Sequence, residues 1–195
     1  TEFGKELDSL TDFVSFGIAP AFILYFWELK NYGKIGWAIT LIFSVCCVLR
    51  LARFNLTKIT ENDSWKLNYF EGVPSPAGGG LILLPLIYEL SEINSVIDVK
   101  SYTPYFVVLV SILLISKIPT FSLKKIKISS KLTVFLLFGF GITLVSLIFF
   151  TFKTLFSVGL LYLLSIPISY FSYSHRSKKI KNTSIEKEEE HEDIL

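Results

Sequence analysis

Residues 1–20 read TEFGKELDSLTDFVSFGIAP, in which a polar segment is followed by the start of a long apolar run. Gly4, Asp8 and Asp12 are four residues apart, which puts all three on one face of an α-helix, one turn above the next. We call these three residues the ladder. Charged side chains at the end of a membrane helix cost free energy, so a structural or functional role is expected for them. One interpretation is that the acids only complement the helix dipole.

A metal site is the other interpretation of the ladder. Two carboxylates one turn apart can share a divalent cation, and oxygen ligands suit Mg²⁺ or Mn²⁺, which commonly also hold substrate phosphates. A carboxylate beside such an ion can act as a general base toward a hydroxyl. Gly4 lacks a side chain on the same face, so a ligand can approach the backbone there. From spacing alone both interpretations stay open.

The composition predicts an all-α, polytopic membrane protein. Hydrophobic residues make up 51% of the 195 residues, and the mean hydropathy is +0.54. Cys46 and Cys47 are adjacent in an apolar run, which suits neither a disulfide nor a metal site, so we interpret them as packing residues. No nucleic-acid partner is expected.

Apolar stretches of near-membrane length follow one another along the chain. They cover residues 10–27, 36–54, 76–90, 102–120, 131–152 and 155–173. We therefore expect about six transmembrane helices within one membrane-embedded domain, residues 1–173. Residues 174–195 are polar and highly charged, and are expected to form a disordered tail.

The distribution of basic residues predicts the orientation. Of the 19 Lys and Arg residues, only Lys30, Lys34, Lys100 and Lys153 fall on the side away from the N-terminus. Basic residues concentrate on the cytoplasmic side of membrane proteins. The ladder and both ends of the chain should therefore face the cytoplasm, in a bacterial-type cell membrane.

The segment GKELDSLTD resembles the second half of the CDP-alcohol phosphatidyltransferase signature, D-x2-D-G-x2-A-R-x8-G-x3-D-x3-D. Together with LDSLTDFVSFGIAPA, LRLARFN and FEGVPSPAGGG, it is similar to the membrane-embedded phosphatidylserine synthases over residues 3–80. The first half of the signature does not occur here, and the chain begins at Thr1 without a methionine. We expect this sequence to be an N-terminally shortened piece that is inactive alone.

The resemblance implies a reaction and a role for each ladder residue. CDP-diacylglycerol and L-serine would give phosphatidylserine and CMP, with Mg²⁺ or Mn²⁺ as cofactor and a homodimer as the usual assembly. Asp8 and Asp12 would be metal ligands. Asp12 would also be the catalytic base that takes the proton of the serine hydroxyl, and Gly4 would let the nucleotide sit close.

Arg50 and Arg53 lie three residues apart near the cytoplasmic end of the second apolar stretch. They are candidate ligands of the substrate phosphate or of the serine carboxylate, Arg53 being preferred. The alternative is that they anchor the helix by reaching lipid phosphates. The segment GVPSPAGGG presents small residues, which suit either close helix packing or a substrate pocket.

Two rival functions remain open. A member of the same fold could use another acceptor, such as glycerol phosphate, inositol phosphate or choline. A phosphorylated acceptor would need more basic residues near the pocket than Arg50 and Arg53. A small transporter with a cation-binding acid pair is the rival from a different class, but it should show inverted repeats or broken helices at mid-membrane depth.

Overall fold

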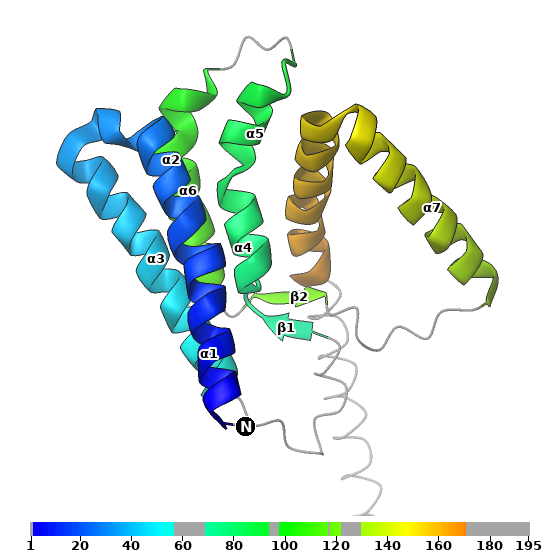
Figure 1. Ribbon diagram of the computed structural model, residues 1–195, viewed down its shortest axis with the longest axis horizontal. Helices are drawn as coiled ribbons and strands as arrows, with labels where there is room; N and C mark the ends of the chain where they lie inside the picture. The colour runs from blue at the N-terminus through cyan, green and yellow to red at the C-terminus, as the bar shows by residue number, and fades with distance from the viewer. Residues whose placement is uncertain (1, 57–68, 94–97, 117, 122–129, 171–195) are drawn as a thin grey trace, which may run out of the picture.

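The computed structural model describes residues 2–56, 69–93, 98–116, 118–121 and 130–170 (Figure 1). Helices dominate this part of the chain, which confirms the predicted all-α class. Each of the six apolar stretches is helical over most of its length in the structure. The predicted tail lies outside the described residues.

The first apolar stretch belongs to one nearly continuous helical rod. It consists of α1 (Glu2–Asp12), the π-helical segment η1 (Phe13–Ile18) and α2 (Ala19–Trp27). The ladder therefore belongs to the same rod, in the part of α1 that precedes the apolar run. The short 3₁₀ segment η2 (Leu29–Tyr32) then reverses the chain.

The second stretch forms α3 (Gly33–Leu56), which begins at a glycine with φ +56°. The third is broken into α4 (Ser75–Ile82) and α5 (Leu84–Leu90). Pro85 explains the break, because it lacks the N–H that would continue the helix and its ring crowds the preceding turn.

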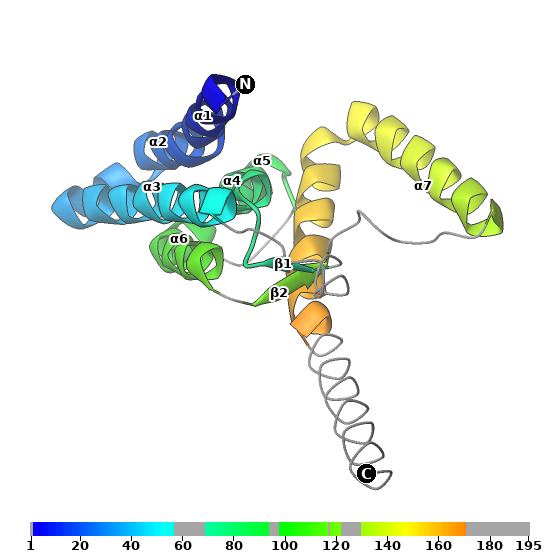
Figure 2. The ribbon, with the colours of Figure 1, turned by 90° about the horizontal axis from the view of Figure 1, so that it is seen from below.

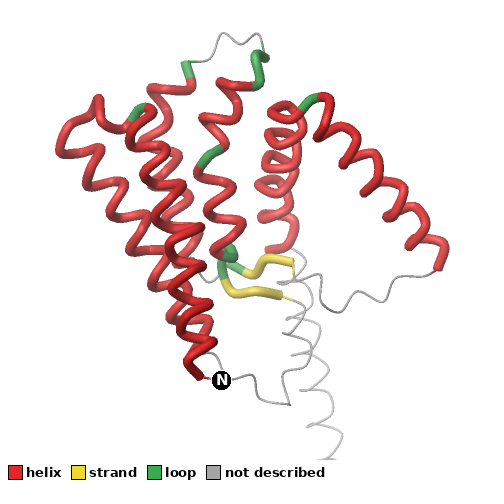
Figure 3. The backbone as a smooth tube through the Cα atoms, in the orientation of Figure 1, coloured by secondary structure: helices red, strands yellow, loops and turns green. Residues whose placement is uncertain are grey.

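The remaining stretches form α6 (Val99–Ile115), α7 (Ser130–Phe149) and a last helix, Thr151–Tyr170. The prediction that the fourth span continues to residue 120 is wrong, because α6 ends at Ile115. Beyond it, β2 (Pro119–Phe121) pairs antiparallel with β1 (Tyr69–Glu71), which was not predicted. Figure 3 shows this strand pair toward the end of the bundle that holds the N-terminus.

Three helical segments in the described ranges are long and apolar enough to cross a membrane: Phe3–Trp27, Leu29–Leu56 and Thr151–Tyr170. Two further apolar helices, Val99–Ile115 and Thr133–Phe149, are shorter. These lengths and compositions agree with an integral membrane protein.

The core lies where α2, α3, α4 and α6 meet. Phe43 of α3 belongs there to a cluster of buried side chains that includes Leu24, Ile82 and Leu114. Seen from below, α7 leans away from this group of helices (Figure 2), and its described side chains are largely exposed. Such an apolar surface suits lipid rather than water.

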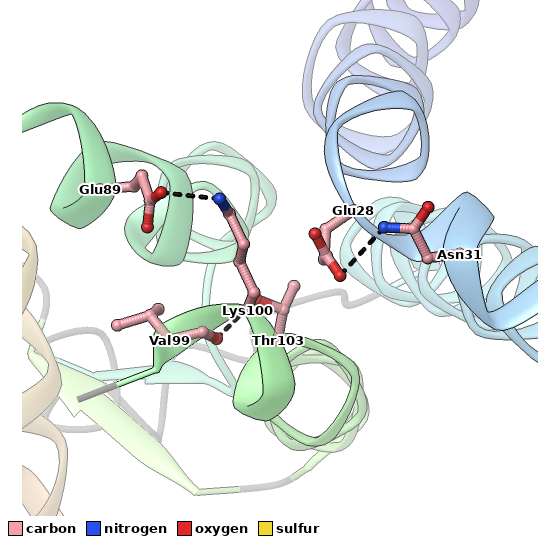
Figure 4. A network of polar contacts seen from close by, with 6 residues as sticks. All are labelled: Glu28, Asn31, Glu89, Val99, Lys100 and Thr103. Carbon is pink, nitrogen blue, oxygen red and sulfur yellow. Dashed lines mark hydrogen bonds and ion pairs between the residues drawn. The ribbon is translucent and has the colours of Figure 1, made fainter.

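Polar contacts form at the end of the bundle opposite the ladder (Figure 4). Lys100 Nζ lies 2.8 Å from Glu89 Oε1, which joins α6 to α5. Asn31 Nδ2 donates to Glu28 Oε1 at 3.2 Å within the turn that precedes α3. The rings of Tyr25 and Trp37 stack edge-on near this end, with centroids 5.2 Å apart, as expected for an interfacial aromatic belt.

Candidate functional site

The ladder lies on α1 as the spacing predicted. Gly4 and Asp8 are exposed, and Asp12 is half-buried at the junction with η1. Neither carboxylate makes a hydrogen bond or an ion pair with another residue in the described part of the chain. The two acids are therefore available to bind a ligand from outside the fold.

The hydroxyls next to the ladder are already engaged. Ser9 Oγ donates to the carbonyl oxygen of Lys5 at 3.0 Å, and Thr11 Oγ1 to that of Leu7 at 2.8 Å. Asn55 Nδ2, near the end of α3, donates to Ser9 Oγ at 2.9 Å and so ties α3 to α1. These bonds keep α1 beside α3 without involving the carboxylates.

A π-helical segment begins directly after Asp12. The wider turn of η1 brings Gly17 so close to α3 that a Cβ at this glycine would lie 3.1 Å from Cys47 Sγ. Single π-helical turns inside α-helices occur frequently at functional sites. This one lies where the rod packs closely against α3.

The small residues of α4 serve mainly packing. A Cβ at Gly79 would lie 2.9 Å from the carbonyl oxygen of Phe16 in η1, and one at Gly78 would lie 2.6 Å from the Leu114 side chain of α6. Gly80, in contrast, faces open space. Of the two interpretations of this segment, close helix packing holds for Gly78 and Gly79.

Arg50 and Arg53 hold the start of α4 and the end of α6. Arg50 is 5% exposed, and its Nε donates to the carbonyl oxygen of Val73 at 3.2 Å. Arg53 Nη2 donates to the carbonyl oxygen of Ile115 at 2.7 Å. The Arg50 guanidinium also lies 5.9 Å from the ring centroid of Phe54, within cation–π range.

The segment between these arginines and α6 is tightly constrained. Gly72 has φ +74°, and a Cβ there would lie 2.6 Å from the carbonyl oxygen of Ser116. Its N–H donates to the carbonyl oxygen of Ile118 at 2.9 Å. Only glycine fits this left-handed position so close to a second backbone.

Cys47 of α3 is a fully buried free thiol. The Ser75 hydroxyl lies within hydrogen-bonding reach of this thiol, and the charges of Asp12 and Arg50 are near enough to influence it. The structure therefore brings Asp12, Arg50 and Ser75 into one region. Sequence reasoning missed Ser75, although its place in GVPSPAGGG next to a helix start was a signal.

The ladder fits part of a metal site. Hard oxygen ligands from successive turns are the donor set that Mg²⁺ and Mn²⁺ prefer, and both carboxylates lack protein partners in the described ranges. No group of three or more His, Cys, Asp or Glu side chains in those ranges is placed to hold an ion. Asp8 and Asp12 would thus supply two ligands of a larger set.

Comparisons with known proteins give a consistent result. The sequence model of the CDP-alcohol phosphatidyltransferases matches residues 1–163. A protein of Helicobacter pylori strain 26695, named CDP-diacylglycerol–serine O-phosphatidyltransferase, is 36% identical over 141 residues, which are 70% of this chain and 56% of that protein.

Two further relatives carry the same name. The Mycobacterium bovis protein is 37% identical over 124 residues, covering 61% of this chain and 42% of its own length. The Methanocaldococcus jannaschii protein is 41% identical over 83 residues, 43% of this chain and 36% of its own length. The chain spans about half the length of the curated relatives it matches.

Proposed function

The chain belongs to the CDP-alcohol phosphatidyltransferase family, and from this premise we propose that it transfers the phosphatidyl group of CDP-diacylglycerol to the hydroxyl of L-serine. The names of the relatives support serine as the acceptor. The observation that carries the proposal is that Asp8 and Asp12 lie on one face of α1, at the end of the bundle, and that neither carboxylate forms a hydrogen bond or ion pair with a described residue.

In the proposed reaction the serine oxygen forms a new bond to the phosphorus that bears diacylglycerol. The bond from that phosphorus to the oxygen of CMP breaks, and CMP leaves with the bonding electrons. Asp12 accepts the proton of the serine hydroxyl. Its half-buried position next to η1 suits this role, because burial leaves the side chain fewer orientations in which to meet the hydroxyl.

Asp8 and Asp12 would hold Mg²⁺ or Mn²⁺ as two ligands of the metal set. When bound, the metal neutralises the charge that develops on the phosphoryl oxygens and orients the diphosphate. Gly4, one turn before Asp8, presents no side chain on this face, and we assign it to close approach of the nucleotide.

We assign Arg53, with Arg50 as second choice, to the carboxylate of serine. A guanidinium has five N–H donors in a planar fork, so the bond from Arg53 to Ile115 is compatible with a second acceptor. A bidentate pair with a carboxylate would fix the orientation of serine relative to Asp12. The other acceptors considered above remain the alternative within the family, while membership of a transferase family disfavours a transporter.

The proposed setting is a cell membrane, with the ladder facing the cytoplasm and two copies of the chain forming a homodimer. The lipid substrate would reach the ladder from the bilayer, and serine from the water on the same side. The excess of basic residues on that side supports this orientation.

The test is CMP release by the purified full natural chain in lipid vesicles that contain CDP-diacylglycerol. We expect release to require L-serine and a divalent cation, with phosphatidylserine as the lipid product. Glycerol phosphate, inositol phosphate and choline are offered in parallel. Release with one of these but not with serine would contradict the proposed acceptor, and release with none would contradict the proposed reaction.

A further inference from the structure

Ser75 carries a buried hydroxyl without a strong hydrogen-bond partner among the described residues. The residue is 4% exposed, and among the described residues no oxygen or nitrogen atom forms a hydrogen bond with its Oγ. Its polar neighbour is the Cys47 thiol, which is only a weak hydrogen-bonding group. A buried hydroxyl without a good partner costs free energy, so its presence calls for an explanation.

Other buried hydroxyls avoid this cost within their own helices. Ser111 Oγ donates to the carbonyl oxygen of Val107 at 2.8 Å, and Ser44 Oγ donates to that of Thr40 at 3.1 Å. Ser75 begins α4, so no helical residue precedes it by one turn to accept such a bond. Ser169 also has an unsatisfied hydroxyl, but it belongs to the last helix.

Two features near Ser75, the start of α4 and the Arg50 guanidinium, favour a bound anion. The Ser75 hydroxyl lies at the N-terminal end of α4, where the helix dipole is positive. Arg50 approaches the same end through its bond to Val73, two residues before Ser75. The Cys47 thiol beside Ser75 also faces Gly17 of η1, the segment that follows Asp12, and the charges of Arg50 and Asp12 both influence this thiol.

We infer that Ser75 Oγ donates a hydrogen bond to an anionic oxygen of a substrate held next to Asp12, together with Arg50 and the start of α4. The inference rests on the proposed function. Both substrates contain such an oxygen: the carboxylate of serine and the diphosphate of CDP-diacylglycerol. Their shared chemistry is a small, strongly accepting anion, which would satisfy a hydroxyl that has no strong partner among the described residues.

The experiment compares Ser75→Ala with Ser111→Ala in the full natural chain. Ser111 is the matched control, because its hydroxyl is equally buried and already satisfied within α6. Each variant is titrated with serine at saturating CDP-diacylglycerol, and with CDP-diacylglycerol at saturating serine. Thermal unfolding without substrates is measured in parallel.

We expect Ser75→Ala to unfold at the same temperature as wild type or higher, because the unsatisfied hydroxyl is gone. Its kcat/KM should fall about tenfold for one substrate, the size of one hydrogen bond to a charged group. A rise in the serine KM assigns the hydroxyl to the carboxylate, and a rise in the CDP-diacylglycerol KM assigns it to the diphosphate. Ser111→Ala should leave both KM values unchanged.

Wild-type kinetics with both substrates in Ser75→Ala would overturn the inference. So would a lower unfolding temperature with both KM values unchanged, because that result indicates a structural hydroxyl. The activity of the wild-type protein distinguishes failure of the proposed function from failure of the inference about Ser75. If it releases no CMP with serine, the proposed function is wrong and the inference falls with it; if it does and Ser75→Ala matches it, only the inference is wrong.

Discussion

Arg53 Nη2 lies 2.7 Å from the carbonyl oxygen of Ile115, the last residue of α6. Carbonyls in the last turn of a helix have no donor within the helix, and a cation there also complements the helix dipole. The bond therefore joins α3 to α6 at the end of the bundle that carries the ladder. It fixes the guanidinium beside the region in which we place the acceptor.

Arg53→Lys should impair the use of serine. Lysine keeps the charge but loses the planar fork, and it cannot hold both Ile115 and a carboxylate in the same geometry. We expect kcat/KM for serine to fall about ten- to a hundredfold, from the loss of about 1.4–3 kcal/mol of charge-assisted bonding. The measurement is a serine titration at saturating CDP-diacylglycerol.

The control for this prediction is Lys30→Ala, which removes an exposed cation at the opposite end of the bundle and should behave as wild type. If Arg53→Lys raises the KM for CDP-diacylglycerol and leaves the serine dependence unchanged, Arg53 serves the phosphates instead. The acceptor would then bind elsewhere.

Asp12→Asn should remove most turnover. The amide keeps the shape of the side chain but cannot accept the proton of serine, and loss of a general base typically costs ~10²–10⁴-fold in kcat. Binding of the nucleotide should persist in part. Glu6→Gln is the control, since Glu6 is an exposed acid on α1 outside the four-residue spacing of the ladder. Near-normal CMP release by Asp12→Asn would refute the assignment of the base.

Removal of divalent cations should abolish CMP release, and added Mg²⁺ or Mn²⁺ should restore it. Asp8→Asn should then need a higher cation concentration for half-maximal activity, because a neutral amide is a weaker ligand than a carboxylate. A cation titration of both proteins checks this shift. An Asp8→Asn enzyme with the wild-type titration curve would exclude Asp8 from the metal set.

Gly79→Ala should lower activity with both substrates. The new methyl group would press on the backbone of Phe16, so that η1 and with it Asp12 must move. Overpacking of this kind costs about 1–3 kcal/mol. Gly80→Ala is the matched control, because its methyl would meet nothing within 4 Å. Thermal unfolding and CMP release of the two variants measure the difference, and equal behaviour would disprove the packing argument.

Long apolar runs and residue spacing were sufficient to predict most of the helices and the ladder. The helical stretches follow from hydrophobicity, and the ladder follows from the helical period, since both properties are local. Ser75 could not be found in this way, because its burial and its lack of a partner depend on how α4 meets α3. The strands β1 and β2 were missed for a similar reason, as three residues show no periodicity and the pairing joins distant segments.

The broken pair α4 and α5 is much shorter along its axis than α3. α4 and α5, from Ser75 to Leu90, extend about 24 Å, while the 24 residues of α3 extend about 36 Å. The hydrocarbon layer of a bilayer is about 30 Å thick, so the broken pair is too short to cross it and α3 is long enough. A pair this short requires that the bilayer thin beside it, or that water enter over one of its ends. Either adjustment brings water and lipid headgroups to the same depth, where a water-soluble and a lipid molecule can meet.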